Sequence, residues 1–385
     1  MAELSKRTSV FTDSVIRRMT RVANKYGAIN LSQGFPDFDP PAEITKRLAE
    51  VASKGPHQYA LTWGAQNFRE ALARKHERFS GQSVDPDKEI VVTCGSTEAM
   101  MSVVMSVANP GDKIIVFSPF YENYGADAIL SGAEPIYVPL NPPEFNFDPV
   151  VLEAAFKQGV KAIIVCNPSN PSGKVFSYEE LSQIAELAKR YDAYVITDEV
   201  YEHIVYEPYK HTYTSTLPGM KERTIICNSL SKTYSITGWR LGYVIGNEDV
   251  IDRVKKVHDF LTVGAAAPLM EAAVAGLEFG DEYYEELRAK YTHMRDLFLG
   301  GLRDIGLKFT EPQGAYYVMV DVSEFGVTDD TQFSEWMAEH IGVAPVPGSS
   351  FFKENIQNYV RLHFAKSDDT LNEAIERLSH LRDYF

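Results

Sequence analysis

The chain has 385 residues, a length that suggests two or three domains. Of these residues 44% are hydrophobic and 24% charged, a balance typical of a globular protein. Asp and Glu outnumber Lys and Arg by 53 to 38, which gives a formal net charge of -15 at pH 7. This acidic excess disfavours general nucleic-acid binding, because that activity needs a basic surface. An anionic small molecule could still bind, provided that arginines are placed locally around it.

The N-terminal segment and the cysteines favour a cytoplasmic protein without membrane association. Residues 1–18, MAELSKRTSVFTDSVIRR, are polar throughout and lack the apolar core of a secretory signal. The most apolar later stretch, VGAAAPLMEAAVAGLEF, is interrupted by Pro268, Glu271 and Glu278, so we do not expect it to span a bilayer. Three cysteines without CxxC spacing disfavour a disulfide framework or a zinc knuckle.

Seven short apolar runs in the middle of the chain predict a buried β-sheet. They are β-branched and apolar on consecutive positions, as strands covered on both faces are. Helical patterns separate them, such as residues 178–191, for which Ser177 is a candidate N-cap. This alternation predicts a mostly parallel, seven-stranded sheet between helices. The runs are Ile90–Cys94, Ile114–Phe117, Ile136–Val138, Ala162–Cys166, Ala193–Thr197, Thr224–Cys227 and Leu241–Ile245.

The C-terminal part of the chain predicts a smaller α+β unit that begins with a long amphipathic helix. We therefore expect an α/β protein with a large domain over residues 46–282. A small domain would combine residues 283–385 with residues 1–45, which include an N-terminal arm. The elements expected in the C-terminal part are a helix from Glu282 to about Gly306, a strand at Ala315–Val320, a helix around Phe333–His340, a strand at Tyr359–Phe364 and a helix from Asp369.

Polar clusters follow five of the predicted strands. In an open parallel sheet, ligands bind beyond the carboxyl ends of the strands. Turns favour the same residue types, but five clusters together, with an Asp and a Lys emerging from buried strands, favour one composite site. The clusters are Gly95–Glu98, Pro119–Tyr121, Asn167–Pro171, Asp198–Tyr201 and Asn228–Lys232.

Other chemistries have no motif in the chain. The sequence contains no GxxxxGK[ST], GxGxxG or GxSxG segment, which disfavours nucleotide-binding loops and a serine hydrolase elbow. None of the nine histidines forms an HExxH pair, so we expect no metal ion in the mechanism.

The segment SLSKTYSITGWRLGY at 229–243 resembles the pyridoxal-phosphate lysine site of the class I/II aminotransferases of fold type I. The resemblance covers nearly the whole chain in the family's order, and it implies that fold together with pyridoxal 5'-phosphate as cofactor. The other matching segments are LSQGFPDFDPP at 31–41, QYALTWGAQNFREAL at 58–72, PGDKIIVFSPFYENY at 110–124, NPSNPSG at 167–173, DEVYEHIVY at 198–206 and YVRLHFAKSDDTL at 359–371.

This resemblance implies a catalytic role for three residues. Lys232 is implied to form a Schiff base with the cofactor and, once released, to move the proton between the substrate α-carbon and the cofactor C4′. Asp198 is implied to keep the pyridine nitrogen protonated, which makes the ring an electron sink. Tyr201, with Asn170 on the other side, is implied to donate a hydrogen bond to the phenolic oxygen of the cofactor.

The remaining cofactor contacts that the resemblance implies surround the phosphate and the ring. A hydroxyl, a guanidinium and helix N-terminal N–H groups suit a phosphate. Tyr59 is implied to reach the phosphate in the neighbouring subunit, so a homodimer with shared sites is expected. The residues are Ser96, Thr97, Ser229 and Arg240 at the phosphate, Tyr121 stacked on the ring, and Tyr59 from the partner.

The substrate contacts depend on a second arginine. Arg361 lies on a predicted strand where alternation turns it away from solvent, so it needs an anionic partner. The resemblance gives the substrate α-carboxylate as that partner, with Asn170 and the backbone of Gly34 nearby. Ile16 and Trp63 are expected to give the entrance an apolar and aromatic character.

We therefore expect an aminotransferase that works by ping-pong half-reactions, with 2-oxoglutarate as the acceptor. Aspartate specificity needs a cation for the distal carboxylate, and Glu98 occupies the turn where one aspartate-specific branch has a lysine. Arg17 and Arg18 are candidate substitutes on a helix where they could equally be solvated. The expected donors are thus a broad range of aromatic and large apolar amino acids, with aspartate left open.

Two other functions are alternatives. A pyridoxal-phosphate-dependent carbon–sulfur β-lyase of the same fold would use the same lysine, aspartate and arginine. A transcription regulator with an aminotransferase-like domain would need a further basic, helical DNA-binding module. The match runs from near residue 10 to the last helix, so we disfavour that second alternative.

Overall fold

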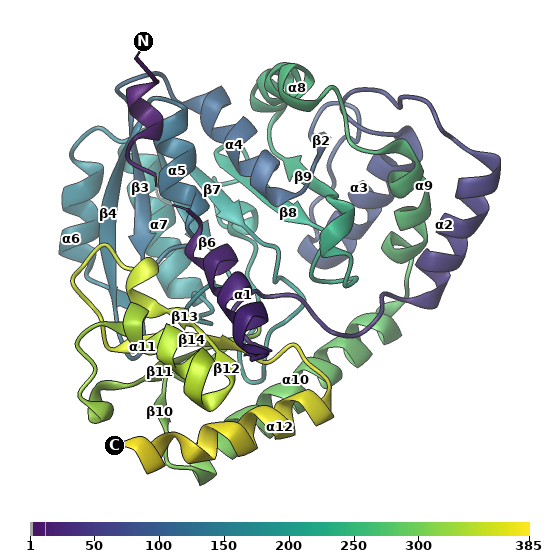
Figure 1. The fold of residues 1–385 in the computed structure, drawn as a ribbon. Coiled ribbons are helices and arrows are strands. Elements are labelled where there is room, and N and C mark those ends of the chain that lie inside the picture. The colour runs from purple at the N-terminus through teal and green to yellow at the C-terminus, as the bar shows by residue number, and fades with distance from the viewer. Residues whose placement is uncertain (1–2, 12) are drawn as a thin grey trace.

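A mixed sheet of eight strands lies at the centre of the computed structural model, which describes residues 3–11 and 13–385 (Figure 1). The strand order is β2-β9-β8-β7-β6-β3-β4-β5, and the run from β8 to β4 is parallel, as expected. The seven predicted strands are all present, and β5 is an additional short strand, antiparallel to β4. The strands are β2 (Ile90–Thr93), β3 (Lys113–Ser118), β4 (Glu134–Asn141), β5 (Asn146–Phe147), β6 (Ala162–Cys166), β7 (Tyr194–Asp198), β8 (Thr224–Ser229) and β9 (Gly242–Ile245).

The consecutive apolar positions of these strands are explained by helices on both faces of the sheet. In β6, Ile163 and Val165 pack into the core beneath α6 and α7, whereas Ala162 and Ile164 face the core shared with α4, α5 and α8. The predicted N-cap of α7 is present, with Ser177 and Glu180 forming a reciprocal capping box. These helices are α4 (Ser96–Val107), α5 (Asn123–Leu130), α6 (Pro149–Phe156), α7 (Tyr178–Arg190) and α8 (Glu248–Thr262).

Three further helices cover the β2–β9 end of the sheet. Phe68 of α3 and Met270 of α9 are fully buried there, in one core with Val92 and Tyr243 of the two strands. The helices are α2 (Ala42–Lys54), α3 (Gln66–Ser80) and α9 (Ala267–Leu277).

The C-terminal part forms a separate four-stranded sheet in the order β10-β11-β14-β13, covered by α10 and α12. The predicted helix around Phe333–His340 is split into α11 and a following π-helical turn at Met337–Ile341. The elements are α10 (Asp281–Asp304), β10 (Lys308–Phe309), β11 (Tyr317–Asp321), α11 (Asp330–Trp336), β13 (Val346–Pro347), β14 (Tyr359–His363) and α12 (Asp368–Ser379).

The N-terminal arm lies against this C-terminal part (Figure 1). β1 (Ile29–Asn30) pairs in parallel with β12 (Val343–Ala344), and α1 (Val15–Tyr26) packs beside them. The two expected domain boundaries, at residues 46 and 282, fall inside the helices α2 and α10 and not in a linker. The division into domains stays a prediction. None of the helices in the described part of the chain combines the length and the apolar character that a membrane crossing requires.

Candidate active site

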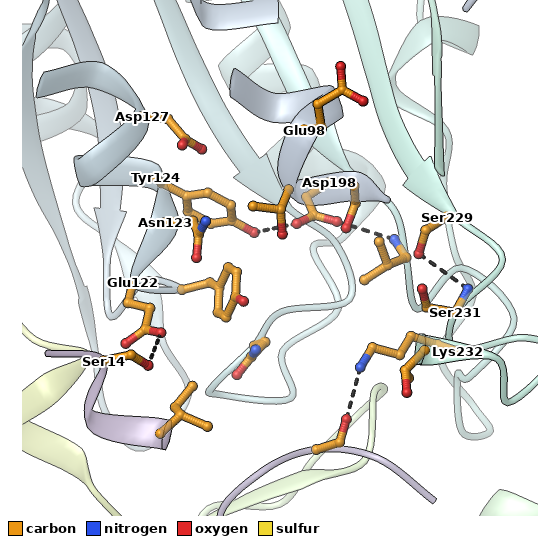
Figure 2. A pocket seen from close by; sticks show the side chains of 18 of the residues that line it. Ser14, Glu98, Glu122, Asn123, Tyr124, Asp127, Asp198, Ser229, Ser231 and Lys232 are labelled. Carbon is orange, nitrogen blue, oxygen red and sulfur yellow. Dashed lines mark hydrogen bonds between the residues drawn. The ribbon is translucent and has the colours of Figure 1, made fainter. Parts of the chain in front are cut away.

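A cavity of about 870 Å³ lies at the carboxyl ends of the parallel strands, where the sequence predicts a composite site (Figure 2). Asp198 ends β7, Ser229 ends β8, and Lys232 follows β8 by three residues. Every predicted site residue except Tyr59 and Trp63 lines this cavity. The predicted residues that line it are Ile16, Gly34, Ser96, Thr97, Tyr121, Asn170, Asp198, Tyr201, Ser229, Lys232, Arg240 and Arg361.

Lys232 has the character of a nucleophilic amine. Its Nζ donates a hydrogen bond to the Gly34 carbonyl oxygen over 2.9 Å (Figure 2). Burial, together with the positive charges of Arg361 and Arg240, lowers the pKa of Lys232 to about 7. A substantial fraction of this amine is therefore neutral near pH 7, as attack on an aldehyde requires.

Asp198 presents a buried carboxylate to the same cavity. Burial raises the pKa of Asp198 to about 6, although hydrogen bonds from Tyr124 and from the Val200 N–H group oppose that rise. The Tyr124 hydroxyl donates to Asp198 over 2.7 Å (Figure 2). The carboxylate is thus mostly ionised at pH 7 and has room for one cationic partner, which a protonated pyridine nitrogen fits.

Tyr124 is a site residue that the sequence analysis missed. It stands at the end of the matching segment SPFYENY, three residues after Tyr121, and is the second residue of α5. Its place in that segment was the available signal. Tyr121 and Tyr124 do meet, edge to face, with ring centroids 5.9 Å apart.

Arg361 lies on β14 and is 1% exposed, so its charge must be met inside the protein. One terminal nitrogen donates to Asn170 Oδ1 over 2.7 Å, and the other donates to the Ser32 carbonyl oxygen. Its guanidinium also lies against the rings of Tyr317 and Phe351. All of these partners are neutral, and the Nε atom is buried without a hydrogen-bond acceptor. A carboxylate bound in the cavity would supply the missing negative charge.

The aromatic wall next to Lys232 contains Tyr201 and Tyr317, whose hydroxyl groups are 2.9 Å apart. Burial raises the pKa of Tyr201 well above its ordinary value, so this hydroxyl keeps its proton. It can therefore donate to an anionic oxygen, which is the property that the predicted contact with a phenolate needs.

The opposite end of the cavity offers donors for a phosphate. α4 begins at Ser96 after Gly95, which has a φ of 86° and no side chain that could cap the helix. The first N–H groups of α4 are thus available for an anion. The Arg240 guanidinium lies so close to Gly95 that a Cβ there would collide with it. Together with the Ser229 hydroxyl, these groups fit a doubly charged phosphate.

Glu98 lies on the same turn but points away from it. Its carboxylate accepts hydrogen bonds from His258 Nδ1 over 2.6 Å and from the Cys94 N–H group over 2.5 Å. The other ring nitrogen of His258 lies 2.9 Å from the Thr62 carbonyl oxygen. Glu98 therefore stabilises the turn that presents the α4 N–H groups, a role that the sequence analysis did not identify.

Two predicted residues lie outside the cavity of their own chain. Tyr59 is 87% exposed, and the ring of Trp63 is covered by Lys255, whose Nζ is 4.9 Å from the ring centroid. The expectation that Trp63 shapes the entrance is thus not met within one subunit. In the described part of the chain, no group of three or more His, Cys, Asp and Glu side chains is arranged to hold a metal ion.

The eight-stranded sheet, the buried lysine at its carboxyl edge and the turn at the N-terminus of α4 are the features of a pyridoxal-phosphate enzyme of fold type I. Residues 26–378 match the family model of aminotransferase class I and II, and the chain belongs to this family. It is therefore a pyridoxal-phosphate-dependent aminotransferase, acting on amino acids and keto acids.

Similar proteins are named for different amino acids. The methionine aminotransferase of Escherichia coli is 35% identical, over 97% of this chain and 96% of its own. Human kynurenine–oxoglutarate transaminase 3 is 33% identical, over 97% of this chain and 89% of its own. The solved structure of N-succinyldiaminopimelate aminotransferase from Mycobacterium tuberculosis has a TM-score of 0.95 and 35% identity, over 99% of this chain and 100% of that chain. These names favour amino-group transfer over the β-lyase alternative.

Proposed function

We propose that the enzyme transfers amino groups from aromatic and large apolar amino acids to 2-oxoglutarate. The observation that carries this proposal is the role of Glu98. One aspartate-specific branch has a lysine at this turn, which binds the distal carboxylate of aspartate. Here the turn carries Glu98, which is paired with His258, so the turn offers no cation for that carboxylate. Apolar side chains of Ile16, Phe35 and Met101 also line the cavity. Relatives named for methionine and kynurenine support the same donor class.

In this proposal, pyridoxal phosphate supplies the electron sink that stabilises negative charge on the substrate α-carbon. Lys232 would hold the cofactor through its Nζ, and as a free amine it would move the proton between the substrate α-carbon and the cofactor C4′. A pKa near 7 suits both transfers, since the amine can accept and release a proton at neutral pH. Its hydrogen bond to Gly34 is one that the lysine has to give up to reach the substrate.

The other residues hold the reactants in place. Asp198 would keep a proton on the pyridine nitrogen, and the Tyr124 hydroxyl orients the Asp198 carboxylate. Tyr201 and Asn170 would bind the phenolic oxygen, and Arg361 would bind the substrate α-carboxylate. Because Arg361 comes from the C-terminal sheet, substrate binding would link the two predicted domains. Ser96, Thr97, Ser229 and Arg240 would hold the phosphate, and Tyr121 would cover the ring, since all five residues line the cavity.

The proposed assembly is a homodimer with shared sites. Tyr59 and Phe260 are 87% and 90% exposed, and with Leu61, Leu261 and Val263 they make up a set of exposed apolar side chains. Leu261 also lines the cavity, so this set adjoins the site, as a dimer surface that completes the site would. A cytoplasmic location stays a prediction from the N-terminal composition and the cysteines.

A mixed-dimer experiment tests the shared sites. Subunits carrying Tyr59→Phe and subunits carrying Lys232→Ala should form hybrids in which one site has both changes and the other has neither. Activity should therefore rise on mixing, up to one intact site per hybrid. A sedimentation profile that stays monomeric at assay concentrations would rule out the dimer.

A panel of amino donors with 2-oxoglutarate tests the proposed function. We expect methionine and the aromatic amino acids to have kcat/KM values at least equal to that of aspartate, with one glutamate formed per donor consumed. If aspartate were better by about a hundredfold, equivalent to about 2.7 kcal/mol of transition-state binding, the assignment of donors would be wrong. Release of ammonia and pyruvate from cysteine conjugates without glutamate formation would indicate the β-lyase.

A further inference from the structure

Three arginines line the cavity, and only two of them have a role in the proposed function. Arg240 lies at the phosphate end against Gly95, and Arg361 is buried beside Asn170. The third, Arg17, belongs to the first turn of α1, where its side chain is exposed. The cofactor and a dicarboxylic substrate together bring three anionic groups: the cofactor phosphate, the substrate α-carboxylate and the substrate distal carboxylate.

Arg17 is a cation that remains available for the third of these groups. Within the residues that the structure describes, it has no carboxylate within ion-pair distance, whereas the adjacent Arg18 lies 3.6 Å from Glu335. The acidic side chains of the cavity are engaged elsewhere: Glu98 with His258, and Glu122 with Ser14. The two remaining acidic side chains are Asp127 and Asp198. Burial raises the pKa of both, which favours their neutral forms.

The N-terminal half of α1 is fixed beside the cavity by hydrogen bonds from Ser14 and from Thr20. The Ser14 hydroxyl donates to Glu122 over 2.6 Å and accepts from the Arg17 N–H group (Figure 2). Thr20 donates to Gln33, another residue of the lining, over 3.0 Å. The backbone that carries Arg17 is thereby fixed relative to the site, which limits the directions open to the side chain.

We infer that Arg17 binds the distal carboxylate of a five-carbon dicarboxylic substrate, namely 2-oxoglutarate and its product glutamate. This inference rests on the proposed function, because it assigns a residue to the second charge of the proposed acceptor. Ile16, next to Arg17, lines the same cavity. The same turn thus provides an apolar side chain for a large donor and a cation for the acceptor, so both half-reactions can use one site.

The test uses the holoenzyme and two probes of equal length, glutarate and pentanoate, which differ in the distal carboxylate. Dissociation constants are measured by calorimetry for the natural chain, for Arg17→Gln and for the matched control Arg18→Gln. We expect the natural chain and R18Q to prefer glutarate by about tenfold, which corresponds to about 1.4 kcal/mol. In R17Q the two probes should bind nearly equally, with the pentanoate constant changed by less than about twofold.

Two further measurements extend the test. The preference for glutarate should shrink as salt is raised, because an ion pair at an exposed guanidinium is screened. The kcat/KM of R17Q for 2-oxoglutarate should fall by about the same tenfold factor as the glutarate affinity.

The possible results separate this inference from the proposed function. An unchanged glutarate preference in R17Q, an equal loss in R18Q, or an equal loss of both probes in R17Q would each overturn the role of Arg17. If glutarate binding depends on Arg17 while the natural chain does not convert 2-oxoglutarate, the anion site stands and the proposed acceptor is wrong.

Discussion

The rate at which the apoenzyme captures its cofactor should depend on pH through Lys232. The neutral amine is the nucleophile, and an amine is neutral above its pKa. An ordinary lysine with a pKa of 10.5 is neutral at pH 7 in about 3 of 10,000 molecules, whereas a pKa of about 7 makes about half of them neutral. The surroundings of Lys232 therefore raise the reactive fraction roughly 1,500-fold, equivalent to about 4 kcal/mol.

Rapid mixing of apoenzyme with pyridoxal phosphate, followed by absorbance between about pH 5.5 and pH 9.5, measures this dependence. The second-order rate constant should rise about tenfold per pH unit below pH 7 and level off above about pH 8. Nα-acetyl-lysine, whose free ε-amine has an ordinary pKa, corrects in a parallel reaction for titration of the cofactor once its own neutral fraction is divided out. A rate that keeps rising to pH 9.5 would show that Lys232 has an ordinary pKa.

A variant identifies the cause of the lowered pKa. Burial is the largest contribution and the positive charge of Arg361 is the next. Arg361→Met removes that charge, so the pH at which capture levels off should move upward, while Arg18→Gln should leave it in place. If R361M levels off at the same pH as the natural chain, burial and the positive charge of Arg240 would have to account for the low pKa.

Two other predictions concern Asp198 and a buried ion pair. Asp198→Asn should lower kcat by about a hundredfold or more, because the amide cannot hold the proton on the pyridine nitrogen, while the phosphate contacts retain the cofactor. Single-turnover kinetics with a measured cofactor content test this prediction. An unchanged kcat would mean that another group holds the pyridine nitrogen. Lys75→Met should destabilise the fold by about 3–5 kcal/mol, since Lys75 Nζ lies 2.6 Å from Glu202 and both side chains are buried. Urea unfolding of the apoenzyme measures that loss, and a change below about 1 kcal/mol would mean that Asn228 and Tyr213, which also donate to Glu202, suffice.

The strands and their order along the chain could be predicted because burial on both faces leaves a direct mark on the sequence. Ala162–Cys166 is apolar at every position since helices cover both sides of β6. β5 left no such mark, because Asn146–Phe147 is only two residues long and pairs through its backbone with the end of β4. The reversed direction of β9 likewise depends on the path of the connecting chain, which apolar periodicity does not encode.

Within the site, most of the residues proposed to contact the reactants could be placed at the cavity from the sequence, whereas the residues that orient them could not. Lys232, Asp198 and Arg361 each stand in a segment that resembles a motif of the family, and the resemblance implies the role of each residue. Tyr124 and His258 act through other side chains, Asp198 and Glu98, and their contacts arise only when α5 and α8 pack against the sheet. The position of Tyr59 is a further case, since its proposed role belongs to a surface that one subunit does not complete.

The chain carries a net negative charge, yet its cavity is lined by as many basic as acidic side chains, the acidic ones being Glu98, Glu122, Asp127 and Asp198. A chain of formal charge -15 places Lys232, Arg240, Arg361 and Arg17 around one cavity. Burial lowers the pKa of both Lys232 and Arg361, so their positive forms are held there at a cost in folding stability. An anionic cofactor and an anionic substrate offset that cost only when they bind. The same residues that make the empty fold less stable therefore make it selective for anions, in spite of the repulsive field of the protein as a whole.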